Sequence, residues 1–134
     1  MTENAMVGIV LISHSRAIAE GAADLAAQVS AGAVRVVGVG GTDDGRLGTS
    51  IDALSSAVDK VSAGVGVVVI PDLGSAVLTV KAYLADVDTS TSVIAIADAP
   101  FVEGAVAAAV TASAGAALDE VLAAAEGARD VRKL

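Results

Sequence analysis

Four short apolar runs rich in valine and isoleucine restrict the fold of this sequence more than any other feature. None of them alternates apolar with polar residues, as a strand with one face in water would. Each is therefore expected to be a strand buried on both faces, which is typical of a parallel sheet. The predicted strands span residues 6–12 (MVGIVLI), 34–39 (VRVVGV), 65–70 (VGVVVI) and 92–97 (SVIAIA).

Apolar residues recur at helical spacing between and after these runs. A helix expected over residues 15–28 carries one apolar face, made of Ile18, Ala22, Leu25 and Val29. Further helices are expected over residues 49–61, 75–85, 102–112 and 116–125, with a break near Gly115. The alternation predicts an α/β fold, in which a doubly wound, mainly parallel four-stranded sheet of order 2-1-3-4 is flanked by helices.

Composition narrows the class of protein. The 134 residues suit a single domain, 1–134, and with 1% aromatic residues its core must be aliphatic. The uncharged stretch Gly104–Leu118 is too short to span a bilayer, and Met1–Asn4 lacks the basic residues of a signal peptide, so a cytoplasmic protein is expected. A net charge of −8 argues against binding nucleic acid or an anionic membrane. The absence of cysteine excludes disulfides and thiolate metal sites.

The only histidine, His14, stands where the first predicted strand gives way to a helix. In open parallel sheets the functional residues gather at the carboxyl ends of the strands. The start of a helix also presents unpaired N–H groups and a partial positive charge, which suit an anion such as a phosphoryl group. On these grounds His14 is either a phosphoryl acceptor or a residue that caps and packs its turn.

Asp72 ends the third predicted strand, which the expected strand order places beside the first. A carboxylate there would bond one ring nitrogen of His14, fix its tautomer and leave the other nitrogen free as a nucleophile. Gly74 would let backbone N–H groups approach an anion closely. The Ser75 hydroxyl would contact that anion, cap the third helix, or do both.

The glycine-rich segment 40–49 (GGTDDGRLGT) is not a P-loop, because no lysine precedes Thr49, and it lies outside the turn that a dinucleotide fingerprint occupies. Thr42 is expected to face the crevice between the strand ends. Asp43 and Asp44 would bind a metal or simply face water, and no metal or cofactor is predicted. Arg16 and Arg46 would contact a phosphoryl group or an acidic partner, or they are simply solvated cations. The sequence also lacks a G-x-S-x-G nucleophile elbow, and lacks the acidic pair that a receiver domain carries after its first strand.

Four segments at the four strand ends, GIVLISHSRAIAEG, GGTDDGRLGTS, DLGSA and ADAPFVEGA, resemble the mannose-type IIA domains of the bacterial phosphotransferase system. The similarity covers residues 6–125. The forms DLGSA and APFVEG resemble, more narrowly, the DhaM family, the phosphocarrier subunits of phosphoenolpyruvate-dependent dihydroxyacetone kinases. Pro71, directly before Asp72, departs from the family pattern and would alter how the third strand ends.

The resemblance implies a phosphotransferase subunit in which His14 takes phosphate from a separate HPr protein. His14 would pass it to ADP on a DhaL subunit, which phosphorylates dihydroxyacetone on DhaK. Asp72 would orient His14, and the phosphoryl-binding group would comprise Ser15, Arg16, Thr42, Gly74 and Ser75. The family also implies a homodimer. Because the ring must be reached by partner proteins, apolar surface at Leu73 and Phe101 would serve for docking, unless Phe101 belongs to the core. Two alternatives remain, namely a sugar-transporter IIA component that passes phosphate to a IIB domain, and a regulatory domain that transfers nothing.

Overall fold

The structure, a computed structural model, describes residues 5–87 and 93–134, in which strands and helices alternate along the chain. The strands are β1 (Gly8–Ser13), β2 (Val36–Gly40), β3 (Val67–Pro71) and β4 (Ile94–Ile96). The helices are α1 (Arg16–Val29), α2 (Ile51–Val61), α3 (Gly74–Asp86), α4 (Phe101–Ser113), α5 (Leu118–Gly127) and the short 3₁₀ helix η1 (Ala128–Asp130). Every predicted strand and helix is present with slightly shifted ends, although Ser92, where the fourth strand was expected to start, lies outside the described residues.

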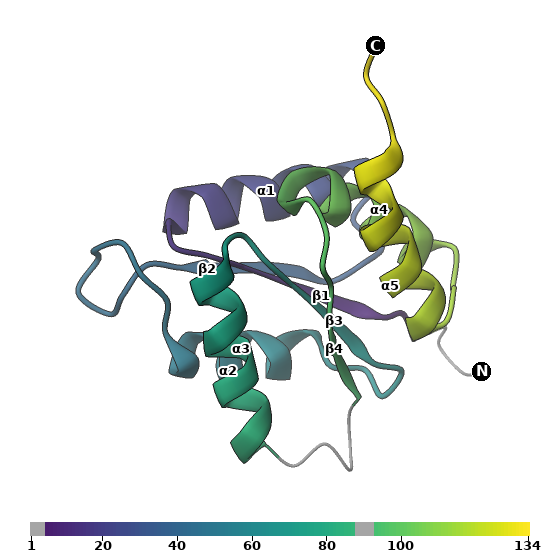
Figure 1. The fold of residues 1–134 in the computed structure, drawn as a ribbon. Coiled ribbons are helices and arrows are strands. Elements are labelled where there is room, and N and C mark those ends of the chain that lie inside the picture. The colour runs from purple at the N-terminus through teal and green to yellow at the C-terminus, as the bar shows by residue number, and fades with distance from the viewer. Residues whose placement is uncertain (1–4, 88–92) are drawn as a thin grey trace.

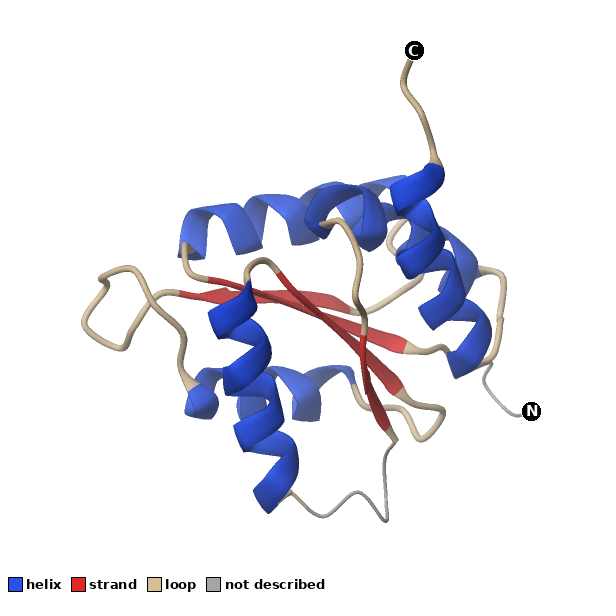
Figure 2. Cartoon of the chain, in the orientation of Figure 1, coloured by secondary structure: helices blue, strands red, loops and turns tan. Residues whose placement is uncertain are grey.

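The strands form one sheet of order β2-β1-β3-β4 with every neighbouring pair parallel, which confirms the predicted α/β class and strand order (Figure 2). The register pairs Ser13 with Gly40 of β2, and Ile12 with Pro71 of β3. Because the strands are parallel and in this register, the residues that follow β1, β2 and β3 emerge at the same edge of the sheet. His14 and Asp72 are therefore neighbours by topology.

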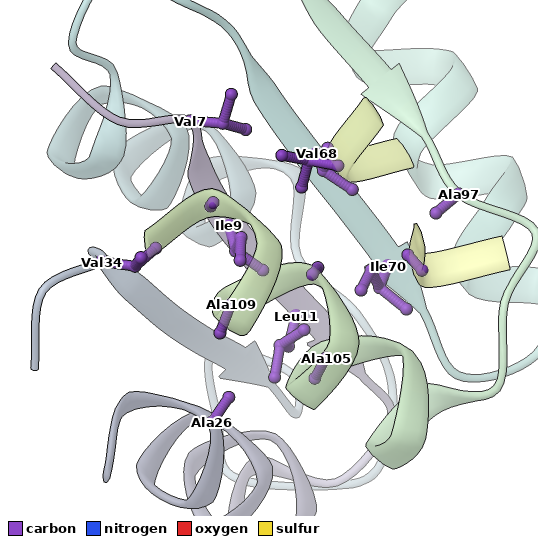
Figure 3. Packing of buried hydrophobic residues seen from close by; sticks show 14 of the residues in the cluster. Val7, Ile9, Leu11, Ala26, Val34, Val68, Ile70, Ala97, Ala105 and Ala109 are labelled. Atoms are coloured by element: carbon purple, nitrogen blue, oxygen red, sulfur yellow. The ribbon is translucent and has the colours of Figure 1, made fainter. Parts of the chain in front are cut away.

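Helices cover both faces of the sheet, with α1, α4 and α5 on one side and α2 and α3 on the other (Figure 1). The sheet contributes valine and isoleucine to both layers. On the side of α1, α4 and α5, the helices α1 and α4 contribute mainly alanine (Figure 3). Small side chains on the helices let them approach the sheet closely. On this face the core is thus built by packing large strand residues against small helix residues. On the other face α2 and α3 contribute larger side chains, among them Leu54, Val80 and the aromatic Tyr83, so the expectation of an aliphatic core holds apart from this one buried ring.

The apolar face predicted for α1 is wrong in its detail. Of its four residues only Ala22 is buried, while Ile18, Leu25 and Val29 are exposed. The buried face consists of Ala19, Ala22, Ala23 and Ala26. The reason is the glycine at position 38 of β2, where an added Cβ would lie 2.2 Å from the carbonyl oxygen of Ala19. A helix this close to the sheet has room only for alanine between the two backbones.

Pro71 does not disturb β3, contrary to the expectation drawn from the family pattern. It is the last residue of the strand and pairs with Ile12, and the next residue, Asp72, donates its N–H to the carbonyl of Ile12 at 3.0 Å. Alternate residues of a parallel strand bond to opposite neighbours, so the nitrogen of Pro71 faces away from β1. The missing N–H therefore costs no bond between β1 and β3.

Polar and glycine residues mark where the helices begin and end. The hydroxyl oxygens of Ser15 and Ser50 cap α1 and α2 by accepting backbone N–H groups, and Gly115, with a φ of 83°, follows the end of α4 as the predicted break. The expected solvated end, residues 129–134, begins inside η1 and is then exposed. Across residues 5–87 and 93–134, no helix combines the length and the apolarity needed to cross a membrane.

Candidate functional site

The backbone of His14 is held from both sides at the edge of the sheet. Its N–H donates to Oδ2 of Asp72 at 3.0 Å, and its carbonyl accepts the N–H of Gly48 at 3.0 Å. Asp72 follows β3, and Gly48 belongs to the loop that follows β2. Because β1 lies between β2 and β3 in the sheet, the segments that follow β2 and β3 both contact His14, the first residue after β1.

The imidazole of His14 lies between a carboxylate and a hydroxyl. Its Nδ1 is 3.0 Å from Oδ1 of Asp72, and its Nε2 contacts the Oγ of Ser75. The side chains of His14 and Asp72 are 23% and 14% exposed, so the pair is shielded while one edge of the ring remains open. The predicted contact between His14 and Asp72 is present, and Ser75 joins it from the first turn of α3.

Asp72 is held in its ionised form. Burial raises the pKa of this carboxyl group, but hydrogen bonds from the His14 N–H, the Ser13 hydroxyl and the His14 ring outweigh burial and keep the pKa below its usual value. An ionised carboxylate only accepts hydrogen bonds, so the nitrogen facing it must carry the proton. The neutral ring is therefore the Nδ1–H tautomer, with the Nε2 lone pair directed at Ser75.

Ser13 completes the contacts around the carboxylate and was not among the residues singled out in the sequence. Its side chain is fully buried, and its hydroxyl donates to Oδ2 of Asp72 at 2.8 Å. The hydroxyl oxygen of Ser13 also accepts the N–H of Ser15 at 3.0 Å. A polar residue at the end of a strand that is otherwise buried and apolar was the available signal, since a buried hydroxyl requires a partner.

The expected phosphoryl-binding residues fall into two groups. Ser75 touches the ring, and Gly74 stands beside it as the first residue of α3. Ser15, Arg16 and Thr42 line, together with His14, a hollow of about 320 Å³ on the side of α1. Ser75 does not cap α3, as one reading of the sequence allowed, because the N-cap is Leu73 and the helix begins one residue earlier.

Cations near the hollow already have partners in the resting protein. Arg16 pairs with Glu20 at 3.0 Å, and Arg46 pairs with Asp44 at 2.7 Å. Thr42 bonds Asp44 within its own loop. Thr42 thus braces the loop that lines the hollow, and no direct contact links it to the ring. In the described part of the chain, no three histidine, aspartate or glutamate side chains come together where a metal ion would need them.

The two residues expected to form a docking surface differ in exposure. Leu73, the N-cap of α3, is 61% exposed beside Asp72. Phe101, the first residue of α4, is partly buried and packs against the core beneath α1 and α4. Leu47, in the loop that lines the hollow, is 78% exposed on the other side of His14. Apolar surface therefore flanks the ring through Leu47 and Leu73.

Comparison with known proteins identifies the family of the chain. Residues 8–122 match the family described as the PTS system fructose IIA component. The chain is 37% identical over 106 residues to the phosphoryl donor subunit DhaM of PEP-dependent dihydroxyacetone kinase 2 from Listeria innocua, covering 78% of this chain and 85% of that protein. It is 31% identical to the phosphotransferase subunit DhaM of a PTS-dependent dihydroxyacetone kinase from Lactococcus lactis, covering 85% and 89% of the two chains.

Two further comparisons concern length and fold. The chain is 32% identical to the DhaM subunit from Escherichia coli strain K12, but spans only 26% of that protein. A crystal structure of a protein of unknown function superposes with a TM-score of 0.81 at 31% identity, covering 91% of this chain and 94% of the other. The match over residues 8–122 and the relatives that the chain covers almost fully show that it belongs to the mannose-type IIA family of the phosphotransferase system.

Proposed function

We propose that this protein is the phosphoryl carrier of a phosphoenolpyruvate-dependent dihydroxyacetone kinase, and that His14 is the residue phosphorylated. The observation that carries the proposal is the arrangement of Asp72, the His14 ring and Ser75, in which one ring nitrogen is held by a carboxylate and the other faces a hydroxyl. The similarity to several subunits named DhaM supplies the system in which such a carrier would act.

The chemistry follows from the tautomer. The Nε2 lone pair attacks the phosphorus of a phosphohistidine on the donor protein, an Nε2–P bond forms, and the donor's N–P bond breaks with its electron pair returning to the donor nitrogen. The proton on Nδ1 stays in place, and Asp72 stabilises the positive charge that the ring acquires. The reverse sequence hands the group to an acceptor oxygen, so the carrier is regenerated unchanged.

A phosphoryl group on Nε2 would project toward the start of α3. There the Ser75 hydroxyl would donate to one phosphoryl oxygen, and the first N–H groups of the helix, which have no partner within it, would face the others. Arg16 and Arg46 would supply positive charge from the other side only by leaving Glu20 and Asp44. Such a site holds phosphate moderately, as reversible transfer requires.

The partners follow from the same proposal. The donor would be HPr, and the acceptor would be ADP bound to a DhaL subunit that serves dihydroxyacetone on DhaK, all in the cytoplasm. The exposed leucines on either side of His14 support contact with partner proteins in both half-reactions, because a ring between two apolar side chains is open to a docked surface. A sugar-transporter IIB domain is the competing acceptor.

We also propose a homodimer, formed through the outer surface of α1 and α4. These two helices pack side by side, and both leave apolar residues exposed. The exposed residues are Ile18, Leu25 and Val29 of α1 and Val102 and Val110 of α4. Monomeric proteins rarely leave extended apolar patches open to water, and a second copy of the same patch would cover this one.

The decisive experiment is phosphorylation by enzyme I, HPr and radiolabelled phosphoenolpyruvate, compared between the wild type and His14→Ala. Because the chain has one histidine, acid-labile label on the wild type alone would identify the site without mapping. No label on the wild type, or label that persists in His14→Ala, would refute the proposal. Label that is discharged by DhaL with ADP, and not by a IIB protein, would select the kinase over the transporter.

A further inference from the structure

One oxygen atom joins the end of β1, the start of α1 and the carboxylate that faces His14. The hydroxyl of Ser13 has a single proton and can also accept. Since the ionised Asp72 cannot donate, the proton must point to Oδ2, 2.8 Å away, and the lone pairs are left to accept the Ser15 N–H at 3.0 Å. Ser13 is fully buried, so water cannot take over either bond.

The two oxygens of Asp72 have different partners as a result. Oδ2 accepts both the Ser13 hydroxyl and the His14 N–H, whereas Oδ1 faces Nδ1 of the ring. A carboxylate held by a single hydrogen bond from the backbone would still rotate about χ2, because aspartate populates a wide range of χ2 angles. Two donors on one oxygen define the plane of the group, and that plane directs the other oxygen at the ring.

We propose that Ser13 is a positioning residue for phosphoryl transfer, which orients Asp72 so that the His14 ring is held with Nε2 free. The proposal rests on the proposed function, because it assigns Ser13 a part in that reaction. This role differs from a purely structural one, because a serine that only stabilised the fold would not affect which nitrogen of the His14 ring carries the proton.

The test compares Ser13→Ala with Ser13→Thr, which keeps the hydroxyl, and with Ser30→Ala as a matched control. Ser30 is also a buried serine, 6% exposed, and its hydroxyl bonds the carbonyl of Ala27 at the far end of α1. ¹⁵N spectra of the single imidazole report the tautomer, and rapid-quench labelling by phosphorylated HPr reports the rate. Unfolding in urea separates effects on stability from both.

Ser13→Ala is expected to lower the share of the Nδ1–H tautomer and to slow labelling about 10-fold, as loss of one hydrogen bond to a charged group predicts. Ser13→Thr should restore both, and Ser30→Ala should change stability alone. A wild-type tautomer and rate in Ser13→Ala would overturn the proposal, as would equal losses in Ser30→Ala. If Ser13→Ala does not fold, Ser13→Cys, a much weaker donor, replaces it with the same expectations.

The tautomer is measured on unphosphorylated protein, with no donor present. If the wild type accepts no phosphate, the proposed function fails, and the ¹⁵N spectra still decide whether Ser13 controls the ring. If the wild type is labelled and Ser13→Ala keeps the wild-type tautomer, the positioning role fails and the proposed function stands.

Discussion

Gly40→Ala should damage the site although it leaves every side chain assigned to the chemistry unchanged. Gly40 ends β2 and pairs with Ser13, and an added Cβ would lie 2.6 Å from the carbonyl oxygen of Ser15 and 2.7 Å from that of Ser13. Both atoms are backbone, so neither can turn aside. Ordinary contacts begin at 3.4 Å, so the turn that carries His14 must move by ~1 Å, and a displacement of this size lowers the rate roughly 10²-fold when it affects a reacting group.

The same clash should lower the free energy of unfolding by about 1–3 kcal/mol, the usual cost of overpacking. Urea titration measures the stability, and the rate of His14 labelling by phosphorylated HPr measures the displacement. Gly21→Ala is the control, because Gly21 is exposed in α1 with no atom within 4 Å of an added Cβ. It should stabilise the protein by about 0.5–1 kcal/mol and leave the labelling rate unchanged. If Gly40→Ala keeps the wild-type stability and labelling rate, the close packing of Gly40 against the backbone of Ser13 and Ser15 does not set the position of His14.

Four other predictions concern the site and the proposed dimer. Asp72→Asn should slow labelling by about 10²–10⁴-fold in rapid-quench assays, since an amide no longer enforces the Nδ1–H tautomer. Because the folded pKa of Asp72 is lowered, its contribution to stability should be complete above about pH 4 and be lost as the pH falls through the folded pKa. Urea titrations at pH 6 and pH 3 should therefore show a smaller acid loss in Asp72→Asn than in the wild type. Ser75→Ala should slow transfer about 10-fold, the cost of one hydrogen bond to a charged group, in the same assay. Leu25→Glu should convert a dimer to a monomer in sedimentation experiments while labelling persists.

Pattern and spacing were enough to predict the fold because the central strands β1 and β3 are buried on both faces. The edge strands β2 and β4 were also expected to be buried, but they are only partly buried because each has one neighbour in the sheet. A run such as residues 65–70 has no polar face to place toward water, so it belongs inside a parallel sheet between layers of helices. The strand order then put Asp72 beside His14 before any side chain was placed. The contact of the Asp72 carboxylate with Nδ1 of the ring, at 3.0 Å, is the outcome that this reasoning predicted most directly.

The details that the sequence pattern did not predict depend on distances and hydrogen bonds between residues that are far apart in the chain. A helical repeat of large apolar residues on α1 looked like its core face, but the distance between α1 and β2 is set by Gly38, and at that distance only alanine fits. Ser13 looked like the ordinary end of a strand, and its role depends on a bond to Asp72 across 59 residues of chain. Ser75 was expected to contact an anion or to cap α3. Its hydroxyl lies against Nε2 of the ring, and the N-cap of α3 is Leu73 instead.

A carrier must hold its nucleophile firmly and its phosphate loosely, and the chain meets these two demands on opposite sides of one ring. Behind His14, bonds from Asp72 and Gly48 fix the backbone, and Asp72 fixes Nδ1. In front, Nε2 contacts the exposed hydroxyl of Ser75. In the proposed mechanism, rigidity comes from groups that do not contact the phosphoryl group, so they need not change when that group would arrive or leave. Under the same mechanism, substitutions at Ser75 should therefore shorten the life of the phosphorylated state as well as slow labelling, whereas substitutions at Asp72 should act mainly on how fast His14 is labelled.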